Sequence, residues 1–249
     1  MGADVGQGET DDERFARTFA EQVADLPGVL AVTLGGSRAT GRHRRDSDWD
    51  FALYYRGSFD ADVVRAAGWP GQVTNPGEWG GGVMNGGAWL QIDGRRVDLI
   101  YRDLDEVEHW WAEAREGRYE KQLLLFHLAG IPTYTVVGEM ALHVVLSGEL
   151  PRPDFPDRLR VSAHERWHVD ATLTLGYARA ALDRGDMAVA TGNVVRAVFE
   201  ESHSRLAQRG EWALNEKGLA ERAGLGALVA DLAPDPARLR AVIDALSAV

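Results

Sequence analysis

Two aspartates at the start of a β-forming run are among the residues of this sequence best suited to chemistry. Asp48 and Asp50 are separated by one apolar residue, Trp49, and the run continues through Phe51. Side chains alternate across a strand, so the two aspartates share one face. Two neighbouring carboxylates repel each other unless a cation lies between them, and hard oxygen ligands of this kind suit Mg²⁺. The pair therefore predicts a magnesium site.

A turn suited to phosphate precedes these aspartates. The apolar run 29–34 predicts a buried strand, and glycines and a serine follow it, including Gly36 and Ser37. Such residues let the backbone turn tightly with its N–H groups exposed, and a turn of this kind can cradle phosphate oxygens. Arg38 comes directly after the serine, and an arginine fork matches triphosphate oxygens. A solvated basic loop is the alternative for this arginine.

A predicted hairpin supplies a third carboxylate. Asp93-Gly94 lies between two β-forming runs, 88–92 and 95–101, and Asp-Gly in this position is a strong hairpin signal. Asp98 falls in the middle of the second run, among Val, Leu and Ile, where an unpaired carboxylate is costly. A metal shared with the first two aspartates would supply a partner. The alternative is a salt bridge to a neighbouring arginine.

The strand, the turn, the ten-residue spacing and the Asp-x-Asp strand together resemble the polymerase-β-like nucleotidyltransferase superfamily. The likeness is closest to the bacterial aminoglycoside and lincosamide nucleotidyltransferases. It implies transfer of a nucleoside monophosphate from a nucleotide triphosphate, with ATP as first choice, to an acceptor hydroxyl. It also implies two Mg²⁺ ions and an acceptor hydroxyl activated by the third carboxylate. The residues that would take the catalytic and metal-binding roles are Asp48, Asp50 and Asp98.

The same resemblance assigns the nucleotide site. The glycine–serine turn would hold the triphosphate, so these roles carry to Gly36 and Ser37, with Arg38 beside them. Lys217 lies in a segment, 212–217, that resembles the C-terminal element approaching the nucleotide in several antibiotic nucleotidyltransferases. A lysine at the start of a helix is the alternative interpretation of Lys217.

A glycine-rich segment at 68–87 precedes the hairpin. It is interleaved with Trp69, Trp79 and Trp89, so it could close over a ligand and offer aromatic faces for stacking. A surface loop whose tryptophans tuck into the core is the equal alternative. Glu78 in this segment is a second candidate for the general base.

The elements that must position these residues form an α+β fold. We expect a mixed β-sheet nucleotidyltransferase domain with flanking helices at 1–150, then an all-α helical bundle at 151–249. Thr10 and Glu13 predict a capping box at the start of the first helix. We also expect a helix at 121–129 and a short strand at 134–137. Prolines crowd into 151–156, which marks the linker between the two domains.

A competing motif lies in the helical half. His164-Glu165-Arg166-Trp167-His168 is a literal H-E-x-x-H on a predicted helix, which taken alone indicates a zinc hydrolase. A catalytic zinc needs a third ligand, and no extended signature follows. The histidines also begin the packed stripe of that helix, so structural or cleft-lining roles are the main alternative.

The composition of the chain limits which kinds of substrate and binding partner we expect. The chain has 249 residues, no cysteine and a net charge of −11, which argues against broad nucleic-acid binding and permits a small cationic acceptor such as an aminoglycoside-like antibiotic. The sequence contains no apolar run long enough to span a bilayer, so we expect a cytoplasmic protein without a membrane partner. Monomer and homodimer both stay open. A protein acceptor, as for an antitoxin-type adenylyltransferase, is the alternative within the same chemistry.

Overall fold

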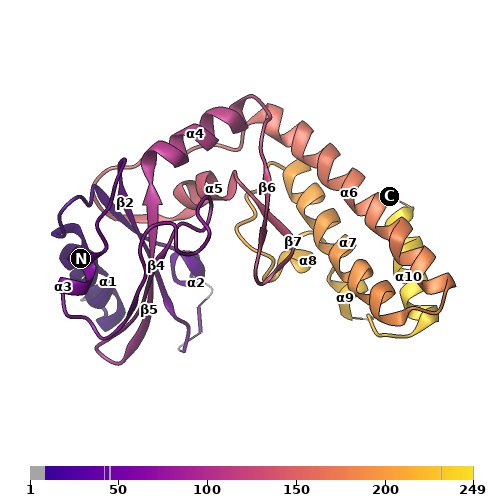
Figure 1. The fold of residues 1–249 in the computed structure, drawn as a ribbon, viewed down its shortest axis with the longest axis horizontal. Helices are drawn as coiled ribbons and strands as arrows, with labels where there is room; N and C mark the ends of the chain where they lie inside the picture. The colour runs from indigo at the N-terminus through magenta and orange to yellow at the C-terminus, as the bar shows by residue number, and fades with distance from the viewer. Residues whose placement is uncertain (1–8, 42, 45, 231, 249) are drawn as a thin grey trace, which may run out of the picture. The chain divides into compact units, whose positions relative to one another are not determined.

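The computed structural model describes residues 9–41, 43–44, 46–230 and 232–248. It confirms the predicted α+β class, with a mixed sheet first and helices after it (Figure 1). Two helices, α4 (Leu104–Arg115) and α5 (Thr135–Leu142), run across the division between two compact units. The first unit is Met1–Glu108 with Glu139–Arg152, and the second is His109–Gly138 with Pro153–Val249.

A six-stranded sheet forms the centre of the first unit, in the order β3-β4-β5-β2-β1-β8. Only the β2 and β5 pair is parallel among these neighbours, and the others are antiparallel. The Asp93-Gly94 hairpin is confirmed as the β4–β5 turn, where both residues have positive φ, as a type I′ turn requires. The strands are β1 (Ala31–Leu34), β2 (Trp49–Tyr55), β3 (Gly71–Val73), β4 (Gly87–Ile92), β5 (Arg95–Asp103) and β8 (Val144–Ser147).

Helix α1 (Asp11–Ala24) covers one face of this sheet. Its predicted capping box is confirmed, because Thr10 and Glu13 each bond to the other's backbone N–H. The buried Phe15 and Phe19 rings meet the Trp49 and Phe51 rings edge to face, at 4.7 and 4.9 Å between centroids. This apolar layer fixes the orientation of β2 and turns the intervening Asp50 to the opposite face. The short α3 (Asp62–Ala66) adds Val64 to the same core.

The opposite face of the sheet is divided along its length. At one end, buried Arg102 of β5 donates to both carboxylate oxygens of Glu139, at 2.6 and 2.9 Å. Thr33 of β1 and His143 bond nearby, at 3.2 Å. Toward the other end this face carries the partly exposed Asp50 and Asp98.

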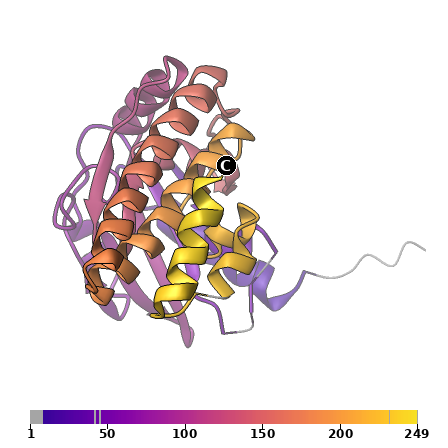
Figure 2. The same ribbon diagram turned by 90° about the vertical axis from the view of Figure 1, so that its right-hand side faces the viewer.

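The second unit is built from helices that pack side by side (Figures 1 and 2). Asp186 and Asp235 cap α7 and α10 with side-chain bonds to backbone N–H groups. Small residues such as Ala178, Ala190 and Ala197 are fully buried in the core, which lets the long helices approach closely. The helices are α6 (Asp157–Asp183), α7 (Met187–Gln208), α8 (Leu219–Arg222), α9 (Gly226–Ala230) and α10 (Pro236–Ser247).

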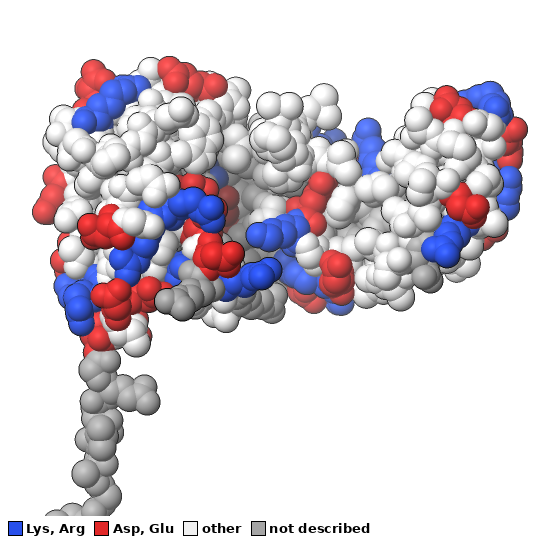
Figure 3. All heavy atoms as spheres, turned by 90° about the horizontal axis from the view of Figure 1, so that it is seen from below, with Lys and Arg blue, Asp and Glu red and all other residues white. Residues whose placement is uncertain are grey.

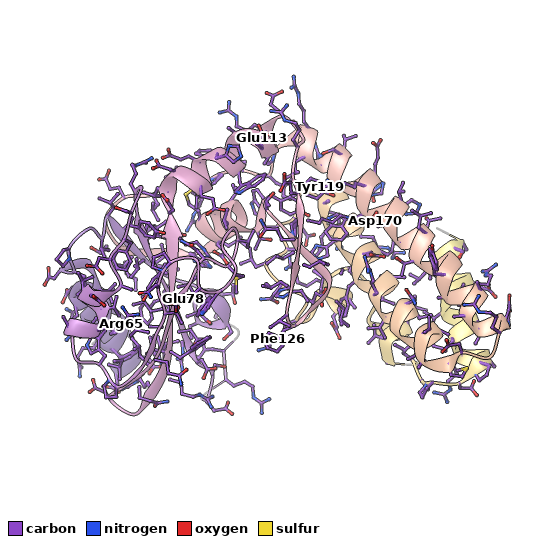
Figure 4. All side chains as sticks on the ribbon, in the orientation of Figure 1. Arg65, Glu78, Glu113, Tyr119, Phe126 and Asp170 are labelled. Atoms are coloured by element: carbon purple, nitrogen blue, oxygen red, sulfur yellow. The ribbon has the colours of Figure 1, made fainter. Side chains whose placement is uncertain are left out.

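Two local predictions are wrong, and both concern residues 121–137. The segment predicted as a helix is a hairpin, β6 (Lys121–Leu124) with β7 (His127–Pro132). Phe126 stands at its tip, 95% exposed (Figure 4). The segment predicted as a strand, 134–137, enters α5 instead. The domain boundary at 150 stays a prediction, because the compact units describe packing whereas the predicted domains describe function.

Charged side chains of both signs are intermixed on the face shown in Figure 3. In the part of the chain that the structure describes, no helix combines the length and apolarity needed to cross a bilayer.

Candidate active site

Two carboxylates lie side by side where β2 and β5 run parallel. Asp50 is in direct register with Asp98, so both side chains leave the same face of the sheet from strands about 4.8 Å apart. Their neighbours Trp49 and Val97 point the other way and are buried in the core. Asp48 lies one residue before β2 and two before Asp50. The structure therefore places Asp50 beside Asp98, with Asp48 two residues before Asp50 along the chain.

The glycine–serine turn lies against Asp50. The Gly35 N–H donates to the Asp50 carbonyl at 2.7 Å, which ties the end of β1 to the start of β2. Gly36 has a φ of +60°, and a Cβ added there would overlap the Asp50 carboxylate. Ser37 follows in α2 (Gly36–Ala39), a single helical turn. Glycine at position 36 is thus required twice, by backbone conformation and by the contact with the carboxylate.

Asp48 is paired at the surface. Its carboxylate accepts from Arg96 Nε, and Arg96 also donates to the Asp46 carbonyl at 2.9 Å. The two side chains are 44% and 63% exposed, and an exposed ion pair of this kind contributes only ~0–1 kcal/mol. The Asp48 carboxylate can therefore exchange its Arg96 partner for a metal ion at little cost in free energy.

Asp98 has the environment of a base. Burial raises the pKa of its carboxyl above the usual aspartate value, and the negative charge of Asp48 raises it further, while Arg96 opposes the shift. A carboxylate with a raised pKa holds a proton more strongly, which favours proton abstraction from a hydroxyl.

Arg38 is held by the protein itself. Its guanidinium donates to the carbonyls of Asp48 (3.3 Å) and Ser47 (2.9 Å) and to the Asp12 carboxylate (3.0 Å). It also stacks on the Trp49 ring at 3.9 Å. Arg38 therefore fixes the backbone that carries Asp48, and its contact with the triphosphate stays a prediction. Of the neighbouring arginines, positions 42 and 45 lie outside the described residues.

The donor set is suited to a hard divalent cation. Mg²⁺ takes one or two carboxylates with substrate phosphates and waters, and the Asp50 and Asp98 pair offers that number on one face. Within the described ranges, the structure contains no ready-made cluster of three or more metal-ligating His, Cys, Asp or Glu side chains. Asp48, the third predicted ligand, is paired with Arg96 here.

One of the three tryptophans that the sequence offers as stacking faces lies next to Asp98. Trp89 of β4 is in direct register with Asp98, so the two side chains share the face that also bears Asp50. Trp89 is 47% exposed and stacks on Trp79, with 4.8 Å between ring centroids. Trp69, by contrast, packs against Phe19 in the core. Counting outward from the Asp93-Gly94 turn pairs Trp89 with Asp98, so the signal was present in the sequence.

Two further predicted residues lie apart from these contacts. Glu78 (labelled in Figure 4) accepts from Asn75 Nδ2 at 2.6 Å within the glycine-rich loop. Lys217 belongs to the second compact unit and is exposed, and its N–H donates to Asn215 Oδ1 at 3.0 Å. The roles of Glu78 as a base and of Lys217 in nucleotide binding stay predictions.

A protein-family model described as the nucleotidyltransferase domain matches residues 16–117. This segment contains the glycine–serine turn, the three aspartates and Trp89. Residues 16–117 are therefore a nucleotidyltransferase domain, as predicted. The class of protein that the fold and site define is a nucleotidyltransferase enzyme.

Other comparisons add little. No curated protein matches the chain in sequence. A solved nucleotidyltransferase-like protein from Exiguobacterium sibiricum is 11% identical with a TM-score of 0.43, covering 95% of this chain and 73% of that one. An aminoglycoside 6-adenyltransferase from Bacillus subtilis is also 11% identical, with a TM-score of 0.27, covering 96% of this chain and 90% of that one. Because both TM-scores are below 0.5, we draw nothing about the substrate from them.

Proposed function

We propose that this enzyme transfers a nucleoside monophosphate, AMP from ATP as first choice, to a hydroxyl of a small cationic acceptor such as an aminoglycoside-like antibiotic. The observation that carries the proposal is the direct register of Asp50 with Asp98, with Gly36 against the Asp50 carboxylate. The turn that we propose to bind phosphate thus lies next to two carboxylates that share one sheet face.

The residues of the proposed site follow one another across neighbouring strands of the sheet. The glycine–serine turn is followed by Asp50 on β2, then Asp98 on β5, then Trp89 on β4. The triphosphate end is therefore at the turn, and the acceptor end is at Trp89, with Asp98 between them. Asp98 is then the residue closest to both reacting groups, which supports it over Glu78 as the base.

In the reaction, the acceptor oxygen forms a bond to the α-phosphorus while the bond from that phosphorus to the bridging oxygen of pyrophosphate breaks. Asp98 takes the hydroxyl proton, and pyrophosphate leaves with the electron pair of the broken bond. Gly36 and Ser37 hold the β- and γ-phosphates. Asp48 and Asp50 would hold two Mg²⁺ ions and Asp98 one of them, and bound Mg²⁺ supplies neutralisation of the charge on the attacking and leaving oxygens.

The acceptor end is suited to a cation with an apolar ring face. An exposed indole attracts a cation or the C–H face of a sugar ring, and here Asp98 lies beside it. The net charge of −11 favours approach of a cationic substrate to the protein as a whole. A polycationic amino sugar combines these properties, which supports the aminoglycoside-like class.

The test is mass spectrometry of an aminoglycoside and lincosamide panel incubated with the protein, Mg²⁺ and each of the four NTPs. We expect an acceptor heavier by one nucleoside monophosphate. Asp50→Asn should lower the rate by at least about 10²-fold, comparable to losing one preorganised electrostatic group. Asp46→Asn is the matched control, because this neighbouring carboxylate is 82% exposed and has no proposed role.

Two outcomes would count against the proposal. Equal rates for Asp50→Asn and the unmodified protein would overturn the assignment of the metal-binding carboxylates. If no panel member forms an adduct while Mg²⁺ and nucleotide still bind, the small cationic acceptor is wrong, and a protein acceptor takes its place.

A further inference from the structure

The H-E-x-x-H motif is not part of the site described above. His164 and His168 lie one turn apart on α6, which packs along α7 in the second unit. Their rings are 6.2 Å apart between centroids and line a cavity of about 510 Å³. The other lining residues come mainly from α7, and they are Glu201, Arg205, Gln208, Arg209 and Ala223.

His164 makes two contacts with the Ser204 hydroxyl of α7, and they favour one tautomer. The Ser204 hydroxyl donates its single proton to the His164 carbonyl, at 3.0 Å. The same hydroxyl lies 2.8 Å from His164 Nδ1 and has no second proton to give. When the hydroxyl keeps its bond to the carbonyl, His164 donates from Nδ1, and the neutral ring then has a lone pair on Nε2.

The tautomer of His168 follows from a carboxylate. His168 Nδ1 lies 3.1 Å from Glu201 Oε2, and an ionised carboxylate only accepts hydrogen bonds. The other oxygen of Glu201 accepts from Arg205 Nε at 2.8 Å, so that the side chain, 5% exposed, is held in place. His168 therefore also carries its proton on Nδ1 and presents an Nε2 lone pair.

Each histidine thus has the environment of a metal ligand before any metal is bound. Ligating histidines typically donate their other ring N–H to a carboxylate or another acceptor, which fixes the ring and strengthens the ligand. Histidines at i and i+4 share a helix face, which is the spacing of paired histidine ligands in H-E-x-x-H metal sites. In the described part of the chain, the hydrogen bonds of both rings are made through Nδ1 and not through Nε2.

The nearby cations are already paired. Arg205 is bound to Glu201, while Arg209 donates to the Arg222 carbonyl at 2.7 Å and pairs with Glu211 at 3.2 Å. Imidazole suits the first-row transition metals rather than Mg²⁺, so the class of ligand is Zn²⁺ or a similar ion.

We propose that His164 Nε2 and His168 Nε2 form a two-histidine transition-metal site on α6, supported from α7 by Glu201 and Ser204. Gln208 lines the same cavity, and water would fill the remaining coordination positions. This is not a zinc hydrolase site, because catalytic zinc takes three protein ligands and the described part of the chain offers no set of three metal-ligating His, Cys, Asp or Glu side chains. The predicted hydrolase alternative is therefore not supported by this geometry.

The test is calorimetric titration of the full-length chain with Zn²⁺, in the Asp50→Asn background so that the carboxylate site contributes less. One equivalent should bind. The double change His164→Gln with His168→Gln should abolish that binding, and His109→Gln, an exposed histidine elsewhere in the same unit, should leave it unchanged. Glu201→Gln should weaken it by about 10- to 100-fold through the supporting hydrogen bond.

Two further measurements identify the ligands of the bound metal and test whether the variants fold. The Co²⁺ absorption spectrum should show nitrogen ligation that disappears in the double variant. Circular dichroism of the variants without metal should show an unchanged helical fold, which separates lost ligands from lost structure. Zn²⁺ binding that persists in the folded double variant, or no binding by the unmodified protein, would overturn the proposal.

Discussion

At the scale of single residues, the site depends on how closely the turn approaches the carboxylate. Position 36 needs both a positive φ and the absence of a side chain, because the space beyond its Cα is filled by the Asp50 carboxylate. Gly41 has a similar φ, +66°, but a Cβ there would meet nothing within 4 Å. A substitution at Gly41 therefore tests the cost of backbone strain alone, whereas a substitution at Gly36 tests strain together with the clash against Asp50.

We predict that Gly41→Ala destabilises the protein by about 1–2 kcal/mol, the cost of a left-handed alanine, and retains activity. Gly36→Ala should cost more than this and lower kcat/KM by at least about 10²-fold, because the carboxylate or the turn must move. Urea denaturation gives the first quantity and NMP transfer the second. Equal effects of the two changes would show that Gly36 contributes only its backbone conformation.

Trp89 provides the second residue-scale prediction. Trp89→Ala should raise the acceptor KM by about 5- to 30-fold, corresponding to ~1–2 kcal/mol of ring stacking or cation–π interaction, and leave the NTP KM unchanged. Trp89→Phe should restore most of the loss because an aromatic face remains. A raised NTP KM with an unchanged acceptor KM would instead place the nucleobase on this ring.

The three aspartates and the turn were predictable because residue type, alternation and spacing determine which side chains share a strand face. Trp89 was predictable in principle, since the two-residue hairpin turn fixes its register with Asp98. The interactions of Arg38 could not be predicted from the sequence. Its stacking on Trp49 and its bond to Asp12 depend on how α1 packs against the sheet, which no local pattern specifies.

At the scale of helices and strands, the sequence predicted an element correctly where several independent local signals agreed. The first helix has a capping box, an apolar stripe and a Pro-Gly stop, and all three agree with the structure. The hairpin β6–β7 has a nearly continuous apolar run, 123–128, which fits a helix or a strand equally. Its turn also lacks the usual residues, because Phe126 takes a φ of +71° where glycine would be expected.

Packing of α6 on α7 buries a histidine, His203, whose protonation links the stability of the protein to pH. His203 of α7 is buried, stacks on Trp167 at 4.4 Å, and has no hydrogen-bond partner for either ring nitrogen among the described residues. Burial, the largest cause, acts together with the nearby His127, Lys121 and Arg222 to lower the pKa of His203 to about 3. The folded state therefore holds this ring neutral.

We predict that acid destabilises the protein through this residue. Below pH 6.5 the unfolded chain binds a proton at His203 that the folded chain does not bind until about pH 3, so stability is complete above pH 6.5 and falls as the pH drops. Between pH 7 and pH 5 the contribution is about 2 kcal/mol. His203→Phe keeps the stacking on Trp167 and should remove that part of the pH dependence. Parallel stability profiles of variant and parent, from denaturant melts, would contradict this.

At the scale of the whole molecule, the chain is interlaced between its two compact units. Residues 139–152 supply β8 and the Glu139 partner of Arg102 to the first unit. Residues 109–138 supply the β6–β7 hairpin to the second, where Glu216 accepts from two N–H groups of β7 at 2.8 and 2.7 Å. In the same unit, Trp167 donates to the buried Tyr134 hydroxyl at 3.0 Å. Neither unit is continuous in sequence.

This interlacing predicts how fragments behave. A fragment of residues 1–150 keeps the segment 109–138 but loses its partners on α6 and beyond, so it should expose apolar surface and bind the dye ANS. Residues 1–108 joined to 139–152 by a flexible glycine–serine linker contain the whole first unit, and should unfold in one cooperative transition with less ANS binding. Nucleotide with Mg²⁺ should raise the melting temperature of the joined fragment, because the turn and all three aspartates are present in it. If the 1–150 fragment instead melts cooperatively without binding ANS, the domain boundary at 150 describes the folding unit better than the compact units do.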